Sequence, residues 1–135
     1  MAIVDFHVHL TAWGNVPAAE RQAWVESFPA CLDAARLDRA VLFALDNELV
    51  ARTVARDPGR LTAFAFLDPR PPDAPDRLER YVRELGFRGL KMSTSGGPIA
   101  EEGFYANDQA CFKTFERAQT LAHVLRPGFR QAGDA

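Results

Sequence analysis

Hydrophobic residues follow two patterns along the chain. In some stretches they form short runs, and in others they recur every three or four positions among charged residues. Short runs rich in β-branched and aromatic residues predict strands covered on both faces. They occupy residues 3–8, 40–45, 61–67 and 87–92, and a fifth strand is expected to begin at 123–125.

The stretches between these runs predict helices. Residues 17–28 form the first, and Pro29 is expected to restart a helix as its first residue. After the second strand, Asp46 or Asn47 can cap a helix that runs to residue 55.

Two further helices are predicted in the second half of the chain. The clearest is 76–85, where Asp76 and Glu79 form a capping box and Gly86 suits the position after the helix end. The last begins at residue 107 or 108, and its inward face is expected to be Cys111, Phe115, Ala118 and Ala122.

Strict alternation of strands and helices predicts an α/β fold with a parallel sheet. In such sheets ligands bind at the carboxyl ends of the strands. The side chains expected there are His7, His9, Asp46, Asp68 and Lys91. A plainer role exists for the last three, because Asp46 can cap a helix, Asp68 can form the turn before Pro69, and Lys91 can end a strand in solvent.

His7 and His9 are the strongest chemical signal. Residues i and i+2 of a strand share one face, so the two imidazoles are expected to lie a few ångströms apart. Imidazole nitrogens are preferred zinc ligands, and two of them make half of a metal site. The alternative is a strand that happens to end in two histidines. The preceding Asp5 and the βα repeats behind this strand favour the metal site.

Composition excludes several classes of partner. The chain has 135 residues, 25% of them charged, with a formal net charge of −2 spread along its length. Without a basic stripe or a long apolar segment, we expect neither nucleic acid nor a membrane as partner. No signal peptide is expected. Cys31 and Cys111 lack CxxC partners, so we predict buried thiols in a reducing cytoplasm.

Four segments together resemble the amidohydrolase superfamily, and more closely the branch of amidohydrolase-related proteins that includes aminocarboxymuconate-semialdehyde decarboxylase. They are Val4-Asp5-Phe6-His7-Val8-His9-Leu10, Arg39-Ala40-Val41-Leu42, Gly86-Phe87-Arg88-Gly89-Leu90-Lys91, and Asn107-Asp108 followed by Phe115-Glu116-Arg117-Ala118. The resemblance implies a metal-dependent (β/α)8 TIM barrel.

The resemblance also implies roles for individual residues. His7 and His9 match the metal ligands of the first strand, and zinc is the expected metal. Lys91 matches a position where some members carry a carbamylated lysine that bridges two metals. We also expect Trp13, in the loop that follows the two histidines, to contact substrate.

The chain departs from the family pattern in its last residues. Such barrels need about 250 residues, whereas this chain is expected to stop after the fifth strand. Pro127 stands where the family places a strand-five histidine, and the histidine of strand six and the aspartate of strand eight are absent. We therefore expect residues 1–125 to form the N-terminal half of a barrel, truncated or frameshifted, with 126–135 as an irregular tail.

The expected activity is metal-assisted hydrolysis, or decarboxylation, of a small organic acid, with little activity from this chain alone. One alternative is a phosphoesterase of the PHP type, which also opens with a strand-borne HxH motif but needs further His and Glu ligands. The other is a non-catalytic, degenerate half-barrel. Because the edges of a partial sheet invite pairing, a homo-oligomer is expected.

Overall fold

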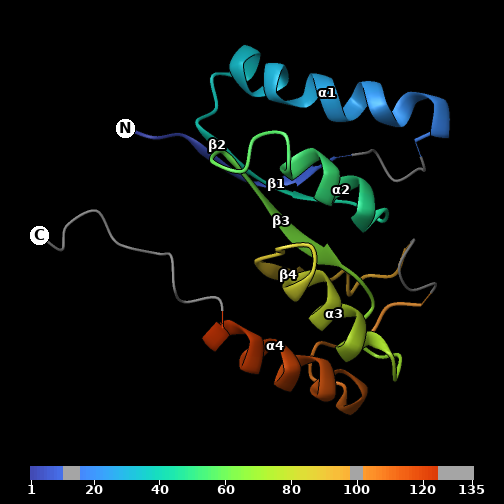
Figure 1. The fold of residues 1–135 in the computed structure, drawn as a ribbon. Helices are drawn as coiled ribbons and strands as arrows, with labels where there is room; N and C mark the ends of the chain where they lie inside the picture. Colours follow the sequence, from blue (N-terminus) through green and yellow to red (C-terminus); the bar gives the residue numbers. More distant parts are fainter. Residues whose placement is uncertain (11–15, 98–101, 125–135) are drawn as a thin grey trace, which may run out of the picture.

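Four parallel strands alternate with helices in the computed structural model, which describes residues 1–10, 16–97 and 102–124 (Figure 1). The strands lie side by side in the order β1-β2-β3-β4. The elements in chain order are β1 Val4–His9, α1 Ala18–Ala35, β2 Arg39–Phe43, α2 Asn47–Val54, β3 Leu61–Phe66, α3 Ala74–Arg83, β4 Gly89–Lys91, the short 3-10 helix η1 Gln109–Cys111, and α4 Phe112–Val124. The parallel α/β fold is therefore as expected.

The helices pack on one face of the sheet. Figure 1 shows α1 beside α2 and α3 beside α4, and each of these pairs is in contact. One core joins the helices to the alternate strand residues that point toward them, among them Leu42, Ala63 and Ala65. Small alanines in the strands allow the helices to approach the sheet closely.

The opposite face of the sheet is hollow. A concavity of about 740 Å³ is lined along the strands by Val4, Phe6, Val41, Thr62 and Phe64. β1 was expected to be a buried strand, which is wrong, because Val4 is 38% and Phe6 69% exposed. The physical reason is that β1 is an outer strand, and no element of the described chain covers its inner face.

The first helix differs from the expectation of a break at Pro29. α1 is continuous from Ala18 to Ala35, with Pro29 inside it. Val25 and Leu32 lie seven residues apart on one helix face, and both are buried in the core. Packing on both sides of Pro29 thus holds the helix together across the missing N–H. Cys31 faces away from this contact and is exposed, so its predicted burial is wrong, whereas Cys111 is buried as expected.

The start of α3 also differs from the expectation. The helix begins at Ala74, so Asp76 lies inside the first turn and forms no capping box with Glu79. Glu79 instead accepts hydrogen bonds from Arg83 and from Arg117 of α4. Gly86 adopts a positive φ of 73° after the helix, which is the geometry expected of it.

The expected fifth strand is not formed by His123 and Val124, because α4 continues through Val124. Neither glycine nor proline occurs between Phe112 and Pro127, so no helix-breaking residue ends the helix before Val124. The helix face also differs from the expectation, since Thr114 and Leu121 are buried whereas Ala122 is exposed. The expected start at Asp108 is correct, because its carboxylate accepts from the Ala110 N–H. The tail at 126–135 lies outside the described residues.

Candidate metal site at the carboxyl edge of the sheet

His7 and His9 meet at the carboxyl end of β1. Their Nε2 atoms are 3.3 Å apart and their ring centroids 5.1 Å apart. The pairing of β1 with β2 shifts register between Asp5 and Val8. The Asp5 carboxylate accepts a hydrogen bond of 2.9 Å from the His7 backbone N–H at this irregularity. Asp5 therefore fixes the backbone that carries the histidines.

The spacing of the two nitrogens fits one metal ion. With Zn–N distances of about 2.0–2.1 Å and a tetrahedral angle, two nitrogen ligands lie about 3.3 Å apart. The same spacing also allows one Nε2–H to donate to the other Nε2 when no metal is bound. Among the described residues no group of three or more His, Cys, Asp or Glu side chains could hold a metal ion. Of the side chains that the sequence suggests as metal ligands, His7 and His9 are the two whose ring nitrogens come into contact.

Two buried phenylalanines orient the imidazoles. The Phe43 ring lies edge-on to His7 at 5.0 Å and to His9 at 4.4 Å, measured between ring centroids. Phe66 lies 6.3 Å from His9 and 5.8 Å from Phe43. Edge-to-face contacts of this kind favour a fixed ring orientation. Neither phenylalanine was anticipated as part of the site, although both lie within predicted strands and are the last residues of β2 and β3.

Lys91 joins the same cluster from the end of β4. Its Nζ lies 5.5 Å from the Phe43 ring centroid and 6.0 Å from that of Phe66, and it donates a hydrogen bond to the Met92 carbonyl. Burial lowers the pKa of His9, and the charges of His7 and Lys91 lower it further. A lowered pKa favours the neutral imidazole at pH 7, which is the form that binds metals.

Asp46 has the plainer of its two possible roles. Its carboxylate accepts a hydrogen bond from the Leu49 N–H at the start of α2 and lies 3.4 Å from Arg21. The next residue, Asn47, is buried, and both ends of its side-chain amide bind the backbone of Phe66. Asp46 therefore caps the helix as expected, and Asn47 supports a wall of the candidate site.

Asp68 forms an ion pair with Arg70. The Arg70 guanidinium donates to the Asp68 carboxylate at 2.8 Å, and the Arg70 backbone N–H donates to the same carboxylate at 3.0 Å. Hydrogen bonding from the Arg70 side chain lowers the pKa of Asp68, against the effect of burial. The guanidinium also lies 4.4 Å from the centroid of the Phe104 ring. Asp68 thus stabilises the turn after β3, as in the plainer of its two expected roles. Trp13, the expected substrate contact, lies outside the described residues.

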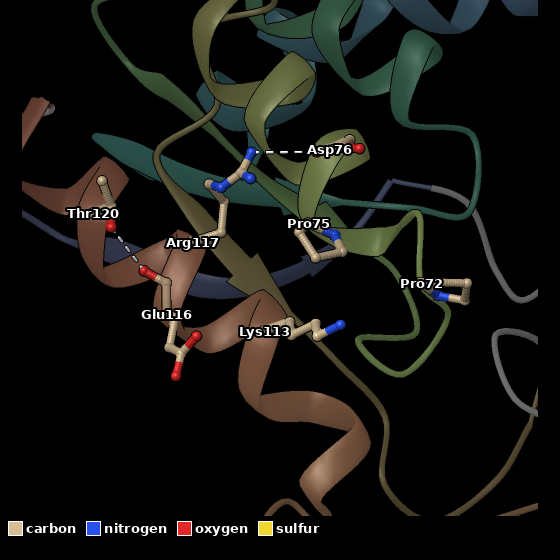
Figure 2. A pocket seen from close by; sticks show the side chains of 7 residues that line it. All are labelled: Pro72, Pro75, Asp76, Lys113, Glu116, Arg117 and Thr120. Carbon is tan, nitrogen blue, oxygen red and sulfur yellow. Dashed lines mark hydrogen bonds and ion pairs between the residues drawn. The ribbon is translucent and has the colours of Figure 1, made fainter.

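A second hollow lies on the helix side, between α3 and α4. Figure 2 shows its lining, with the Arg117 guanidinium directed at Asp76. Arg117 is bound to Asp76 at 3.3 Å and to Glu79, and the Thr120 hydroxyl donates to the Glu116 carbonyl. The bonds from Arg117 to Asp76 and Glu79 join α4 to α3 beside this hollow.

Comparison with known proteins finds a family model that matches most of the chain. The family model described as Amidohydrolase matches residues 4–124. No curated protein matches the chain in sequence.

Solved structures resemble the chain at low sequence identity. A 2,6-dihydroxybenzoate decarboxylase from Rhizobium is 19% identical with a TM-score of 0.61, over 89% of this chain and 47% of that chain. A 5-carboxyvanillate decarboxylase from Novosphingobium aromaticivorans, with bound manganese, is 19% identical with a TM-score of 0.60, over 78% and 37%. A probable 2-pyrone-4,6-dicarboxylic acid hydrolase from Acinetobacter baumannii is 19% identical with a TM-score of 0.59, over 90% and 47%.

These similarities establish the fold as part of a TIM barrel. The chain spans 47% of the Rhizobium decarboxylase and 37% of the Novosphingobium aromaticivorans enzyme. The four parallel strands of its described residues correspond to half of an eight-stranded barrel.

Proposed function

The chain belongs to the amidohydrolase family, and we propose that it binds a divalent metal, zinc in the first instance, through His7 and His9. The observation that carries the proposal is the separation of 3.3 Å between the two Nε2 atoms, which suits two ligands of one ion. The lowered pKa of His9 supports it, because the neutral imidazole is then available at pH 7.

The proposed reaction class is hydrolysis or decarboxylation of a small organic acid. The solved structures that resemble the chain are named for a dihydroxybenzoate, a carboxyvanillate and a pyrone dicarboxylic acid, all of which are ring carboxylates. A bound metal would activate water and polarise a substrate carboxylate. In this chain the Lys91 ammonium would pair with such a carboxylate, and Phe43 and Phe66 would exclude water beneath it. Trp13 is proposed as a further substrate contact.

We further propose that the chain has little activity by itself. Hydrolysis needs a general base near the attacking water, which typically contributes about 10²–10⁴-fold to the rate. At the described strand ends, Asp46 binds a helix start and Arg21, and Asp68 binds Arg70. Because both carboxylates are bonded in this way, we propose neither as the general base nor as a further metal ligand. The phosphoesterase alternative needs additional His and Glu ligands, and these contacts do not provide them. The non-catalytic half-barrel remains compatible with them.

We also propose that the protein is cytoplasmic and forms a homo-oligomer. Both cysteines are free thiols, which agrees with a reducing compartment. Among the described residues no helix is long and apolar enough to cross a bilayer.

Titration calorimetry with zinc and with manganese tests the proposed metal site. We expect weak binding by the wild type and loss of binding in His7→Ala and in His9→Ala, because each removes one of two ligands. His123→Ala, on α4, is the matched control and should bind as the wild type does. Sub-nanomolar affinity that survives His9→Ala would show that other residues hold the metal.

The same proteins can be assayed for turnover. A panel of lactones, amides and aromatic or muconate-type carboxylates should give almost no product with the wild type in the presence of zinc or manganese. Substantial turnover that disappears in His7→Ala would contradict the expected low activity and would show that the site is complete.

A further inference from the structure

The end of β3 extends beyond its pairing with β2. That pairing reaches Leu42 and Ala63, whereas β3 continues to Phe66. Over its last residues β3 pairs with β4, and the final pair is Phe66 with Lys91. Within the described sheet, the β2 side of Phe66 therefore lies past the last strand pair. Its backbone groups on that side need another partner, because a buried N–H or C=O that is left unpaired is costly.

The side chain of Asn47 takes the place of a strand at this point. Successive residues of a strand direct their backbone groups to opposite neighbours, and the Leu67 N–H is directed at β4, where it donates to the Lys91 carbonyl at 3.3 Å. The N–H and C=O of Phe66 therefore face β2, and the Asn47 amide binds both. A side-chain amide has a donor and an acceptor, as a peptide group has, so it can substitute for a strand.

The backbone that Asn47 holds carries a ring that contacts the candidate metal site. The centroid of the Phe66 ring lies 6.3 Å from that of His9, and the Lys91 Nζ lies 6.0 Å from it. The ring also packs edge-on against Phe43, which contacts both histidines. A shift of the Phe66 backbone would therefore move one of the surfaces against which His9 and Lys91 rest.

We propose that Asn47 is a positioning residue for the candidate metal site, acting through Phe66 on the orientation of His9. The inference rests on the proposed function for the role of His9 as a metal ligand. Loss of a group that directly supports a metal ligand typically weakens metal binding by about 10–100-fold. Asn47 acts through one further residue, so the expected effect is at the lower end of that range, about tenfold.

Zinc titration calorimetry and NMR spectra of the metal-free full chain test the inference. Asn47→Ala should bind zinc about tenfold more weakly than the wild type. The ring resonances of His9 should also shift, because the magnetic effect of the Phe66 ring falls steeply with distance. Asn47→Asp keeps the acceptor for the Phe66 N–H and loses the donor, so it should change both measurements in the same direction. It provides the test if Asn47→Ala does not fold.

Thr53→Val is the matched control on the same helix. Thr53 is fully buried, and its hydroxyl donates to the Leu49 carbonyl at 2.9 Å within α2. The substitution removes a buried hydrogen bond but leaves the Asn47 amide and Phe66 in place. Zinc affinity and the His9 resonances should therefore match those of the wild type. Equal changes in Thr53→Val and the Asn47 variants would show a general loss of stability and would overturn the inference.

Phe66→Leu tests the route from Asn47 to His9. It removes the ring and keeps the backbone groups that Asn47 binds. If Asn47 acts through the ring, an Asn47 variant should weaken zinc binding no further in the Phe66→Leu background. Additive losses would overturn the inference, as would unchanged His9 resonances in the Asn47 variants. A wild type without affinity for zinc would overturn the proposed metal site instead, and the His9 resonances of the metal-free chain would still decide the positioning role.

Discussion

The side-chain amide of Asn47 forms hydrogen bonds with both backbone polar groups of Phe66. Its Oδ1 accepts from the Phe66 N–H at 3.0 Å, and its Nδ2 donates to the Phe66 carbonyl at 3.1 Å. Asn47 is 4% exposed at the start of α2, and Phe66 is the last residue of β3. The contact ties a helix start to the strand end that carries one wall of the candidate metal site.

Asn47→Ala should destabilise the fold by about 2–4 kcal/mol, because it leaves a buried N–H and a buried carbonyl without their partners. Urea unfolding followed by circular dichroism measures this change. Asn107→Ala, at an exposed asparagine, is the control and should stay within about 0.5 kcal/mol of the wild type. Equal stabilities for the two variants would show that the Asn47 bonds contribute nothing.

Gly89→Ala should destabilise the sheet at the start of β4. A Cβ atom at this position would lie 2.7 Å from the Phe64 ring, which lines the concavity. The ring must move, and overpacking of this kind costs about 1–3 kcal/mol. Gly59→Ala is the control, because the nearest atom to its Cβ is 3.8 Å away. A Gly89 variant as stable as the Gly59 variant in urea would show that the ring moves freely into the concavity.

Asp68→Asn should lower the melting temperature by a few degrees at pH 7. The hydrogen bonds from Arg70 lower the pKa of Asp68 in the folded chain below its ordinary value of 3.8. Its contribution to stability is therefore present above pH 3.8 and is lost as the pH falls through the lowered pKa. The difference between variant and wild type should shrink accordingly in strong acid. Asp73→Asn, whose side chain is 63% exposed, should change little, and equal shifts for both variants would contradict the argument.

Lys91→Met should raise the pKa of His9. Burial is the largest cause of its lowered pKa, followed by the charges of His7 and Lys91, so removal of the lysine should restore part of the shift. An NMR titration of the metal-free chain measures the change. Lys113→Met, on α4, should leave the His9 titration unchanged. A His9 pKa that is identical in wild type and Lys91→Met would place the ammonium away from the histidines.

Much of the fold follows from local pattern. Apolar runs locate all four described strands, and Asp46 marks the start of α2 because its carboxylate can reach an N–H three residues ahead. The spacing of His7 and His9 is also sufficient to place both imidazoles on one strand face. These features depend on hydrogen bonds and side-chain directions within a few residues, so the sequence by itself determined them.

Other features depend on contacts between distant segments. Pro29 stays inside α1 because Val25 and Leu32 pack against the core on both sides of it. The exposure of Phe6 is decided by the absence of a covering layer in the described chain, although its sequence neighbours suggest a buried strand. The sequence around Asn47 does not indicate its role, because its hydrogen-bond partner, the Phe66 backbone, is 19 residues away and is brought close only when α2 packs beside the end of β3. Only the tertiary structure decided these outcomes, because the burial of a side chain and its hydrogen-bond partners depend on which distant element packs against it.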